Sequence, residues 1–163
     1  MKKLVFADGE RAPDRIAMKA SASSKAAKGQ MTGMLGVYLV AAELTKRGFI
    51  VSPTSRSAFG ADLLVTDERC SKAWSIQVKT NRKAASFWLL SRHAADLQSD
   101  SHVYVFVNLR GDERPDYFVA LSADVARLHR VSKSSTGSVW WSIDAEKIRD
   151  RKDGWTAVFG EAS

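Results

Sequence analysis

The chain has 163 residues, of which 45% are hydrophobic and 26% charged, and these are the proportions of an ordinary single globular domain. No apolar run approaches the ~20 residues that a bilayer-spanning helix needs, so we expect no membrane association. Asp8 and the charges around it cut the apolar start of the chain short, which argues against a signal peptide. Cys70 is alone, which excludes an intramolecular disulfide and agrees with a reducing, cytoplasmic location.

The net charge of +7 makes a polyanion such as DNA the expected partner. Residues 1–30 hold seven Lys or Arg and three Asp or Glu, whereas residues 31–163 hold eighteen and fifteen. Because the segment is also rich in Ala and Ser, we expect residues 1–30 to be a basic, flexible arm and residues 31–163 to be the folded domain. The arm either grips phosphates or is a solvated leader.

After the arm, the apolar spacing predicts a helix over residues 31–47 that ends at Gly48. A run of short strands then follows, with a tight connection between the second and the third that favours a hairpin. The expected strands are residues 49–52, 61–66, 73–80, 87–90, 102–109 and 116–121.

The strand at residues 102–109 is apolar on both faces, which is typical of a sheet that is covered on both sides. Ser122 is expected to cap a helix that runs to about residue 130. Residues 132–138 are expected to form a loop, and the aromatic residues beyond it to pack a terminal flap onto the body. These aromatic residues are Trp140, Trp141, Trp155 and Phe159.

Three polar residues on the predicted hairpin carry the functional signal. Gln77 and Lys79 lie two apart on one strand and therefore share a face, and Asp62 stands at the end of the neighbouring strand. A carboxylate, an amide oxygen and an ammonium around one point suit a hard cation and a phosphodiester.

The motif resembles that of the PD-(D/E)xK nuclease superfamily. Asp62 matches the first acid, and Gln77 to Lys79 matches the (D/E)-x-K tripeptide. Small bacterial members with a Q-x-K variant also have stretches like those at residues 33–49, 60–65, 77–80 and 104–109. The resemblance implies a restriction-endonuclease-like α/β/α fold, in which helices flank a mixed central sheet of about five strands. It implies cleavage of DNA with Mg²⁺ or Mn²⁺, with Asp62, Gln77 and Val78 as the metal ligands.

The site departs from that pattern at two positions. Gln77 is neutral where the pattern has an acid, so the site has one negative charge fewer. Resolvase-like members place a glutamate directly after a helix glycine, where this chain has Gly36 and Val37. Glu43 lies six residues further, about 240° around the helix. It is a candidate catalytic residue, or else an exposed partner of Arg47.

The other roles also stay open at this point. Asp62 can be satisfied by turn amides, Gln77 by the backbone, and Lys79 can extend to water. Trp88, Trp140 and Trp141 can stack on bases or fill a core. The leading hypothesis is a magnesium-dependent DNA endonuclease, for which a homodimer is one expected assembly. The alternative is a non-catalytic protein of the same fold that binds nucleic acid or a protein. The expected DNA contacts are Lys25, Lys28, Arg56, Arg82 and Lys83.

Overall fold

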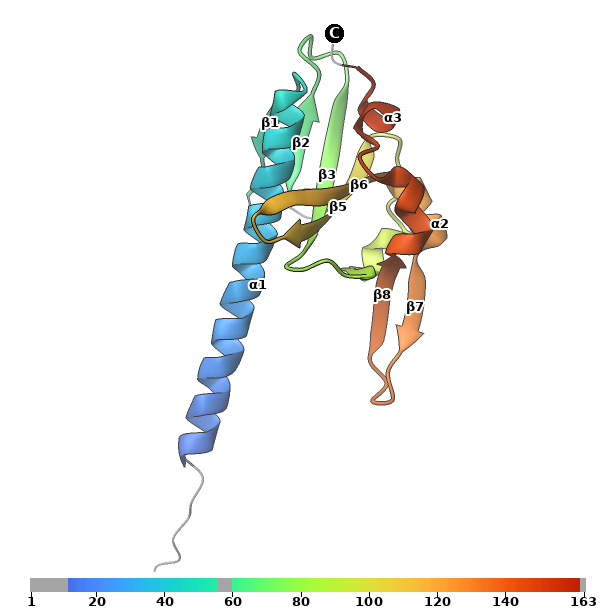
Figure 1. Cartoon of the computed structure of the whole chain (residues 1–163). Helices are drawn as coiled ribbons and strands as arrows, with labels where there is room; N and C mark the ends of the chain where they lie inside the picture. The colour runs from blue at the N-terminus through green and yellow to red at the C-terminus, as the bar shows by residue number, and fades with distance from the viewer. Residues whose placement is uncertain (1–11, 56–59, 162–163) are drawn as a thin grey trace, which may run out of the picture. The chain divides into compact units, whose positions relative to one another are not determined.

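The structure is a computed structural model that describes residues 12–55 and 60–161 (Figure 1). The chain divides into two compact units, residues 1–31 and residues 32–163. The first unit contains the start of helix α1 (Ala12–Lys46), and the second contains the end of that helix and every other described element. Among the described residues, no helix is both long and apolar enough to cross a membrane.

Helix α1 begins at Ala12, not at residue 31 as the apolar spacing predicts. Residues 12–30, which we expect to belong to a basic arm, are thus helical, and the predicted division near residue 30 agrees with the boundary between the two compact units. The flexibility of the arm stays a prediction, and residues 1–11 lie outside the described part of the chain. This segment is rich in alanine and lysine, which have high helix propensity, and Pro13 is tolerated in a first turn, where its missing N–H has no intrahelical partner. Composition alone does not distinguish a charged helix from a mobile segment.

The second unit is built on a five-stranded sheet, and the predicted α/β class with a mixed sheet is confirmed. Strands β3 and β5 are parallel, and the other neighbours are antiparallel, so the predicted hairpin of β2 and β3 is present. In spatial order the strands are β1 (Ile50–Pro53), β2 (Leu63–Thr66), β3 (Ala73–Asn81), β5 (His102–Arg110) and β6 (Glu113–Leu121).

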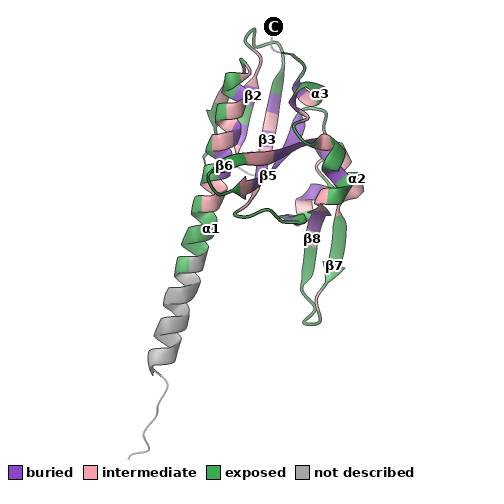
Figure 2. Ribbon diagram, viewed as in Figure 1, coloured by how far each residue is buried: buried purple, intermediate pink, exposed green. Residues whose placement is uncertain are grey.

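One face of this sheet packs against the second half of α1. Val40 and Leu44 of the helix are fully buried, as are Ile76 and Val105 of the strands (Figure 2). The short helix α3 (Trp155–Phe159) contributes Trp155 and Phe159 to the same core. Both residues thus pack onto the body of the domain, as predicted for the terminal flap. Burial of these side chains is the main stabilising contribution to this layer.

Gly36 sets how closely α1 approaches β3. A Cβ atom at this position would lie 1.8 Å from Oγ1 of Thr80 and 2.9 Å from its Cβ. Neither the buried helix backbone nor the strand has room for such an atom, so glycine is required by contact rather than by backbone conformation. The Thr80 hydroxyl is itself buried and has no hydrogen-bond partner among the described residues.

The other face of the main sheet meets a second, three-stranded sheet. Its order is β4 (Phe87–Leu90), β8 (Val139–Asp144) and β7 (Arg130–Lys133). Trp88 and Ile143 from this sheet pack on Tyr104 and Phe106 of the main sheet, together with buried residues of α2 (Ser122–Leu128) and of the 3-10 helix η2 (Ala145–Arg151). A further 3-10 helix, η1 (Arg92–Ala95), follows β4.

The structure corrects three sequence expectations in this region. The expected loop at residues 132–138 begins inside β7 and forms the turn of a hairpin with β8. Every residue of β7 is exposed, so the strand has no buried side to give the sequence a period of two. Ser122 does not cap α2; it is buried, and its hydroxyl donates to the Ser99 carbonyl at 3.0 Å. Trp140 is exposed and does not fill the core.

We predict that Gly36→Ala destabilises the protein by about 1–3 kcal/mol, the usual cost of forcing extra atoms into a packed interior. The matched control is Gly33→Ala, because a Cβ at Gly33 has no neighbour within 4 Å. That control should be neutral or stabilising by up to about 1 kcal/mol through helix propensity. Urea unfolding of the three proteins measures the difference, and equal stability of the two variants would contradict the contact.

Candidate active site

Asp62 stands directly before β2, at the point where the pairing of β2 with β3 ends. The last pair of the ladder on this side is Leu63 with Ile76. The Asp62 amide donates to the Ile76 carbonyl at 2.7 Å, and the Asp62 carbonyl accepts from the Thr54 amide at 3.0 Å. The main chain of Asp62 is therefore hydrogen-bonded to β3 on one side and to the residue after β1 on the other, and these bonds fix the position of its Cα atom.

The Asp62 carboxylate continues the ladder where the strands separate. Its Oδ2 atom accepts a hydrogen bond of 2.5 Å from Gln77 Nε2 and another of 2.7 Å from the Val78 amide. Hydrogen bonds to an ionised acceptor are among the stronger ones in proteins, so the orientation of this carboxylate is well determined. The other oxygen, Oδ1, accepts no hydrogen bond from a described residue.

Lys79 lies on the same face of β3 as Gln77, while Ile76 and Val78 face the core below α1. Burial lowers the pKa of Lys79 from its ordinary value of 10.5, and the charge of Asp62 opposes part of that decrease. No described residue accepts a hydrogen bond from the Lys79 ammonium. The ammonium is thus partly desolvated, close enough to Asp62 to feel its charge, and free to meet an anion.

A cavity of about 250 Å³ opens beside Asp62 and Val78. Its remaining lining comes from the end of β1 and from α1, and Val37 is among the helix residues. Val37 is the position at which the resemblance leads one to expect a glutamate. The cavity therefore has a single carboxylate, and the helix presents an apolar side chain to it. The lining residues are Gly33, Met34, Val37, Pro53, Thr54, Asp62 and Val78.

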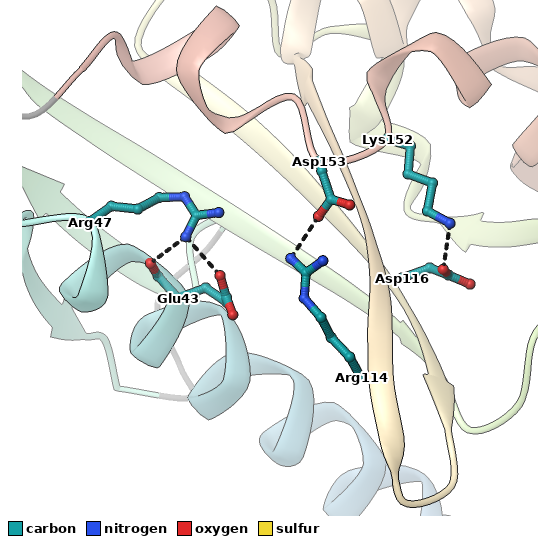
Figure 3. A network of polar contacts seen from close by, with 6 residues as sticks. All are labelled: Glu43, Arg47, Arg114, Asp116, Lys152 and Asp153. Atoms are coloured by element: carbon teal, nitrogen blue, oxygen red, sulfur yellow. Dashed lines mark hydrogen bonds and ion pairs between the residues drawn. The ribbon is translucent and has the colours of Figure 1, made fainter.

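Glu43 belongs to a different cluster (Figure 3). Its Oε2 atom forms an ion pair of 2.7 Å with Arg47, the alternative role that the i, i+4 spacing allows. The Arg47 guanidinium lies 5.1 Å from the ring centre of Trp155. Burial and then the charge of Glu43 raise the pKa of the nearby Tyr117. The structure thus engages Glu43 at the C-terminal turn of α1, and a catalytic role for it remains only a prediction.

The same figure shows two further ion pairs that fasten the C-terminal region to β6. Arg114 pairs with Asp153 at 2.9 Å, and Lys152 pairs with Asp116 at 2.7 Å. These contacts join segments far apart in the sequence. They are structural ties, because each cation already has a carboxylate partner.

The expected DNA contacts are placed unevenly. Arg82 and Lys83 are exposed in the loop between β3 and β4, three and four residues after Lys79. Neither forms an ion pair or hydrogen bond with a described residue. Lys28 is exposed on α1, whereas Arg56 and the side chain of Lys25 lie outside the described part of the structure.

Two asparagines that sequence reasoning missed hold this basic loop in place. Asn81 Nδ2 donates to the Phe87 carbonyl at 2.9 Å and to Asn108 Oδ1 at 3.0 Å, and Asn108 Nδ2 donates to the Ala85 carbonyl at 3.1 Å. Asn108 is buried, with 4% of its surface exposed. The signal that could have found it is a polar amide within the most apolar strand of the chain.

The donors around the cavity fit a weakly held hard cation. Mg²⁺ is usually bound by one or two carboxylates together with water and substrate phosphate. Asp62 offers one carboxylate oxygen that accepts no hydrogen bond from a described residue, and Gln77 and Val78 can add neutral carbonyl oxygens. Among the described residues, no group of three or more His, Cys, Asp or Glu side chains gathers. Such a site would need the phosphate to complete the coordination of the ion.

Comparisons with known proteins give little to add to this geometry. No family model and no curated protein matches the sequence. The structure is similar to that of Hjc, a Holliday junction resolvase from the archaeal hyperthermophile Archaeoglobus fulgidus, with a TM-score of 0.42 and 12% identity. The match covers 68% of this chain and 88% of that one. At this level the similarity supports no statement about activity.

We predict that Asp62→Asn lowers the pKa of Lys79 further, because it removes the charge that opposes desolvation while keeping an oxygen for the Val78 amide. A pH titration of the Lys79 side chain by NMR measures the shift. Asp100→Asn is the control, since Asp100 is exposed and absent from the site. An unchanged Lys79 pKa in Asp62→Asn would show that the two groups do not interact.

The same lowered pKa predicts how Lys79 affects stability. The folded protein releases a proton from Lys79 at a pH at which the unfolded chain still holds it. The free energy of unfolding should therefore gain a contribution that rises with pH between the folded-state pKa and 10.5. Denaturant unfolding at a series of pH values should show a smaller rise for Lys79→Met than for the wild type, and equal slopes would contradict the burial of Lys79.

Proposed function

We propose that the protein is a divalent-metal-dependent endonuclease that hydrolyses phosphodiester bonds in DNA. The observation that supports this best is the proximity of Asp62 to both Gln77 and Lys79 where β2 and β3 separate, together with the cavity that Asp62 lines. The cations of the loop that follows β3, which have no partner among the described residues, extend this site toward a polyanion. A bound Mg²⁺ or Mn²⁺ would supply activation of water and neutralisation of phosphate charge.

Each residue has a separate task in this proposal. Asp62 holds the cation through the oxygen that Gln77 and the Val78 amide leave free. Lys79 stabilises the negative charge that builds up on the phosphate, because its ammonium is partly desolvated and donates to no described residue. Arg82 and Lys83 bind neighbouring phosphates and position the strand.

A second candidate function is DNA binding without cleavage. The Gln77 amide donates a hydrogen bond to Asp62. It therefore stabilises the carboxylate in part, as a bound cation would. Val37 also leaves the cavity without a second acid. This arrangement is expected of a protein that binds no metal and whose site residues form hydrogen bonds with one another.

Cleavage assays on plasmid, linear and branched DNA with Mg²⁺ or Mn²⁺ test the main proposal. Asp62→Asn should lose both metal affinity and cleavage. Lys79→Ala should keep metal affinity, or gain some, while cleavage falls by a factor on the order of 10² to 10³, as for the loss of one oxyanion donor. Lys147→Ala, which removes an exposed lysine of η2, is the control. Absence of metal-dependent cleavage by the wild type on all three substrates would favour the second candidate.

The Gln77→Glu variant separates the two candidates without an activity readout. Without metal it sets a second carboxylate against Asp62, where Gln77 now donates at 2.5 Å, and like charges at that distance cannot both ionise freely. We expect a lower melting temperature for the metal-free variant near pH 8. Mg²⁺ or Mn²⁺ should then raise its melting temperature more than that of the wild type.

Gln98→Glu makes the same chemical change at an exposed position and serves as the control for added charge. It should melt like the wild type with and without metal. If the metal raises the melting temperature of Gln77→Glu no more than that of Gln98→Glu, then position 77 does not face a cation site. That result would contradict a metal-dependent endonuclease.

A further inference from the structure

The outer face of the three-stranded sheet carries exposed apolar side chains. In β4, Trp88 and Leu90 point into the core, so Phe87 and Leu89 point outward, with 42% and 50% of their surface exposed. In β8, Ile143 is fully buried, and by the same alternation Trp140 belongs to the outer face, with 49% exposed. Hydrophobic burial does not explain why these three residues are apolar.

The strand register makes a continuous row of the three side chains. Leu89 lies opposite Ser142, and Phe87 lies opposite Asp144. Trp140 lies two residues before Ser142 in β8 and on the same face, so it is a diagonal neighbour of Leu89. At about 3.3 Å per residue the row extends over roughly 13 Å along the strands, a length that accommodates several nucleotides of an extended strand.

Positive charge borders this row on two sides. Arg130 of β7 lies opposite Ser142, on the outer face. At the start of β4 the row continues into the loop with Arg82 and Lys83, whose cations have no described partner. Asn81 holds the Phe87 carbonyl at 2.9 Å, so the first aromatic of the row has a fixed position relative to the end of β3. Asp144 is the acid on this face, and it lies 3.6 Å from Arg130.

We propose that this face, defined by Phe87, Leu89 and Trp140, binds an unpaired single-stranded segment of DNA next to the candidate active site. Bases would stack on the exposed aromatic rings, while Arg82, Lys83 and Arg130 contact the phosphates. Aromatic stacking requires bases that are not already stacked in a duplex, so the surface selects DNA with a single-stranded region. The proposal rests on DNA as the substrate of the proposed function and names the structural class of that substrate.

A second copy of this chain is the other occupant that an apolar sheet face allows. Complementarity of charge favours DNA, because the chain has a net charge of +7 and, of the cations around the row, only Arg130 pairs with a described carboxylate. Two copies facing each other across this surface would bring those like charges together.

Fluorescence anisotropy with a labelled oligothymidine and with a labelled duplex, both in EDTA, tests the proposal. EDTA keeps binding separate from cleavage, so failure of the nuclease activity leaves this result intact. Trp140→Ala should weaken oligothymidine binding about 5- to 150-fold, the effect of losing one stacked base, and leave duplex binding unchanged. Trp140→Phe should retain most of the affinity, because it retains a ring.

The salt dependence distinguishes stacking from charge. Trp140→Ala should leave the slope of log K against log salt unchanged, whereas Arg82→Ala should reduce its magnitude by about 0.7. Val131→Ala is the matched control, since Val131 is an apolar residue of the same sheet with 53% of its surface exposed, and it lies opposite Trp141 on the other face. Circular dichroism should show all four variants folded.

Three results would overturn the proposal. Trp140→Ala and Val131→Ala could have the same effect on oligothymidine binding. Trp140→Ala could weaken duplex and single-strand binding equally, which would indicate a general change of the surface. Alternatively, light scattering could show that wild-type protein is a dimer and that Trp140→Ala is a monomer, which would assign the face to a second copy.

Discussion

The site depends on the two hydrogen bonds that the Asp62 carboxylate accepts from the Gln77 side chain and the Val78 amide. Without it, the Val78 amide would face the gap between two separating strands with no acceptor, at a cost of about 1–3 kcal/mol for an unsatisfied buried donor. The same contact positions Gln77 and places a negative charge near Lys79. The orientation of Gln77, the pairing of the Val78 amide and the electrostatic state of Lys79 thus all depend on one side chain.

The two faces of the main sheet serve different purposes. The face below α1 is packed mainly with Val, Leu and Ile side chains, and the contact at Gly36 allows the helix to lie close to β3. The other face carries Tyr104 and Phe106 and is covered by the second sheet, which leads back to the loop after β3. The candidate site lies where both layers meet the end of the hairpin, so its cavity is shaped by the helix and its basic loop by the second sheet.

Much of the main sheet could be predicted from the sequence, because its strands have strong apolar patterns and clear turns. The strand expected at residues 102–109 is present as β5 and is one residue longer, and the hairpin that brings Asp62 to Gln77 follows from its short connection. The second sheet could not be predicted in full. All of β7 is exposed, and it pairs with β8 through its backbone, a contact that leaves no mark on side-chain hydropathy.

The site was predictable where it depends on spacing within one strand and unpredictable where it depends on contacts between elements. Two-residue spacing sets Gln77 and Lys79 on one face whatever the rest of the fold does. The direction of Val37 toward the cavity, and of Glu43 toward Arg47, depends on how the helix is rotated on the sheet. The role of Asn108 depends on a loop that precedes it by more than twenty residues in the sequence.

The contact between Gly36 and Thr80 also constrains how this chain can change over time. A side chain at position 36 has space only if the one at position 80 becomes smaller, so either change alone harms packing and the pair together restores it. Among homologous sequences these two positions should therefore covary, with glycine in the helix facing a branched residue in the strand and alanine facing a smaller one. Since Thr80 directly follows Lys79, evolution of the helix surface and of the candidate site is linked through this one point of contact.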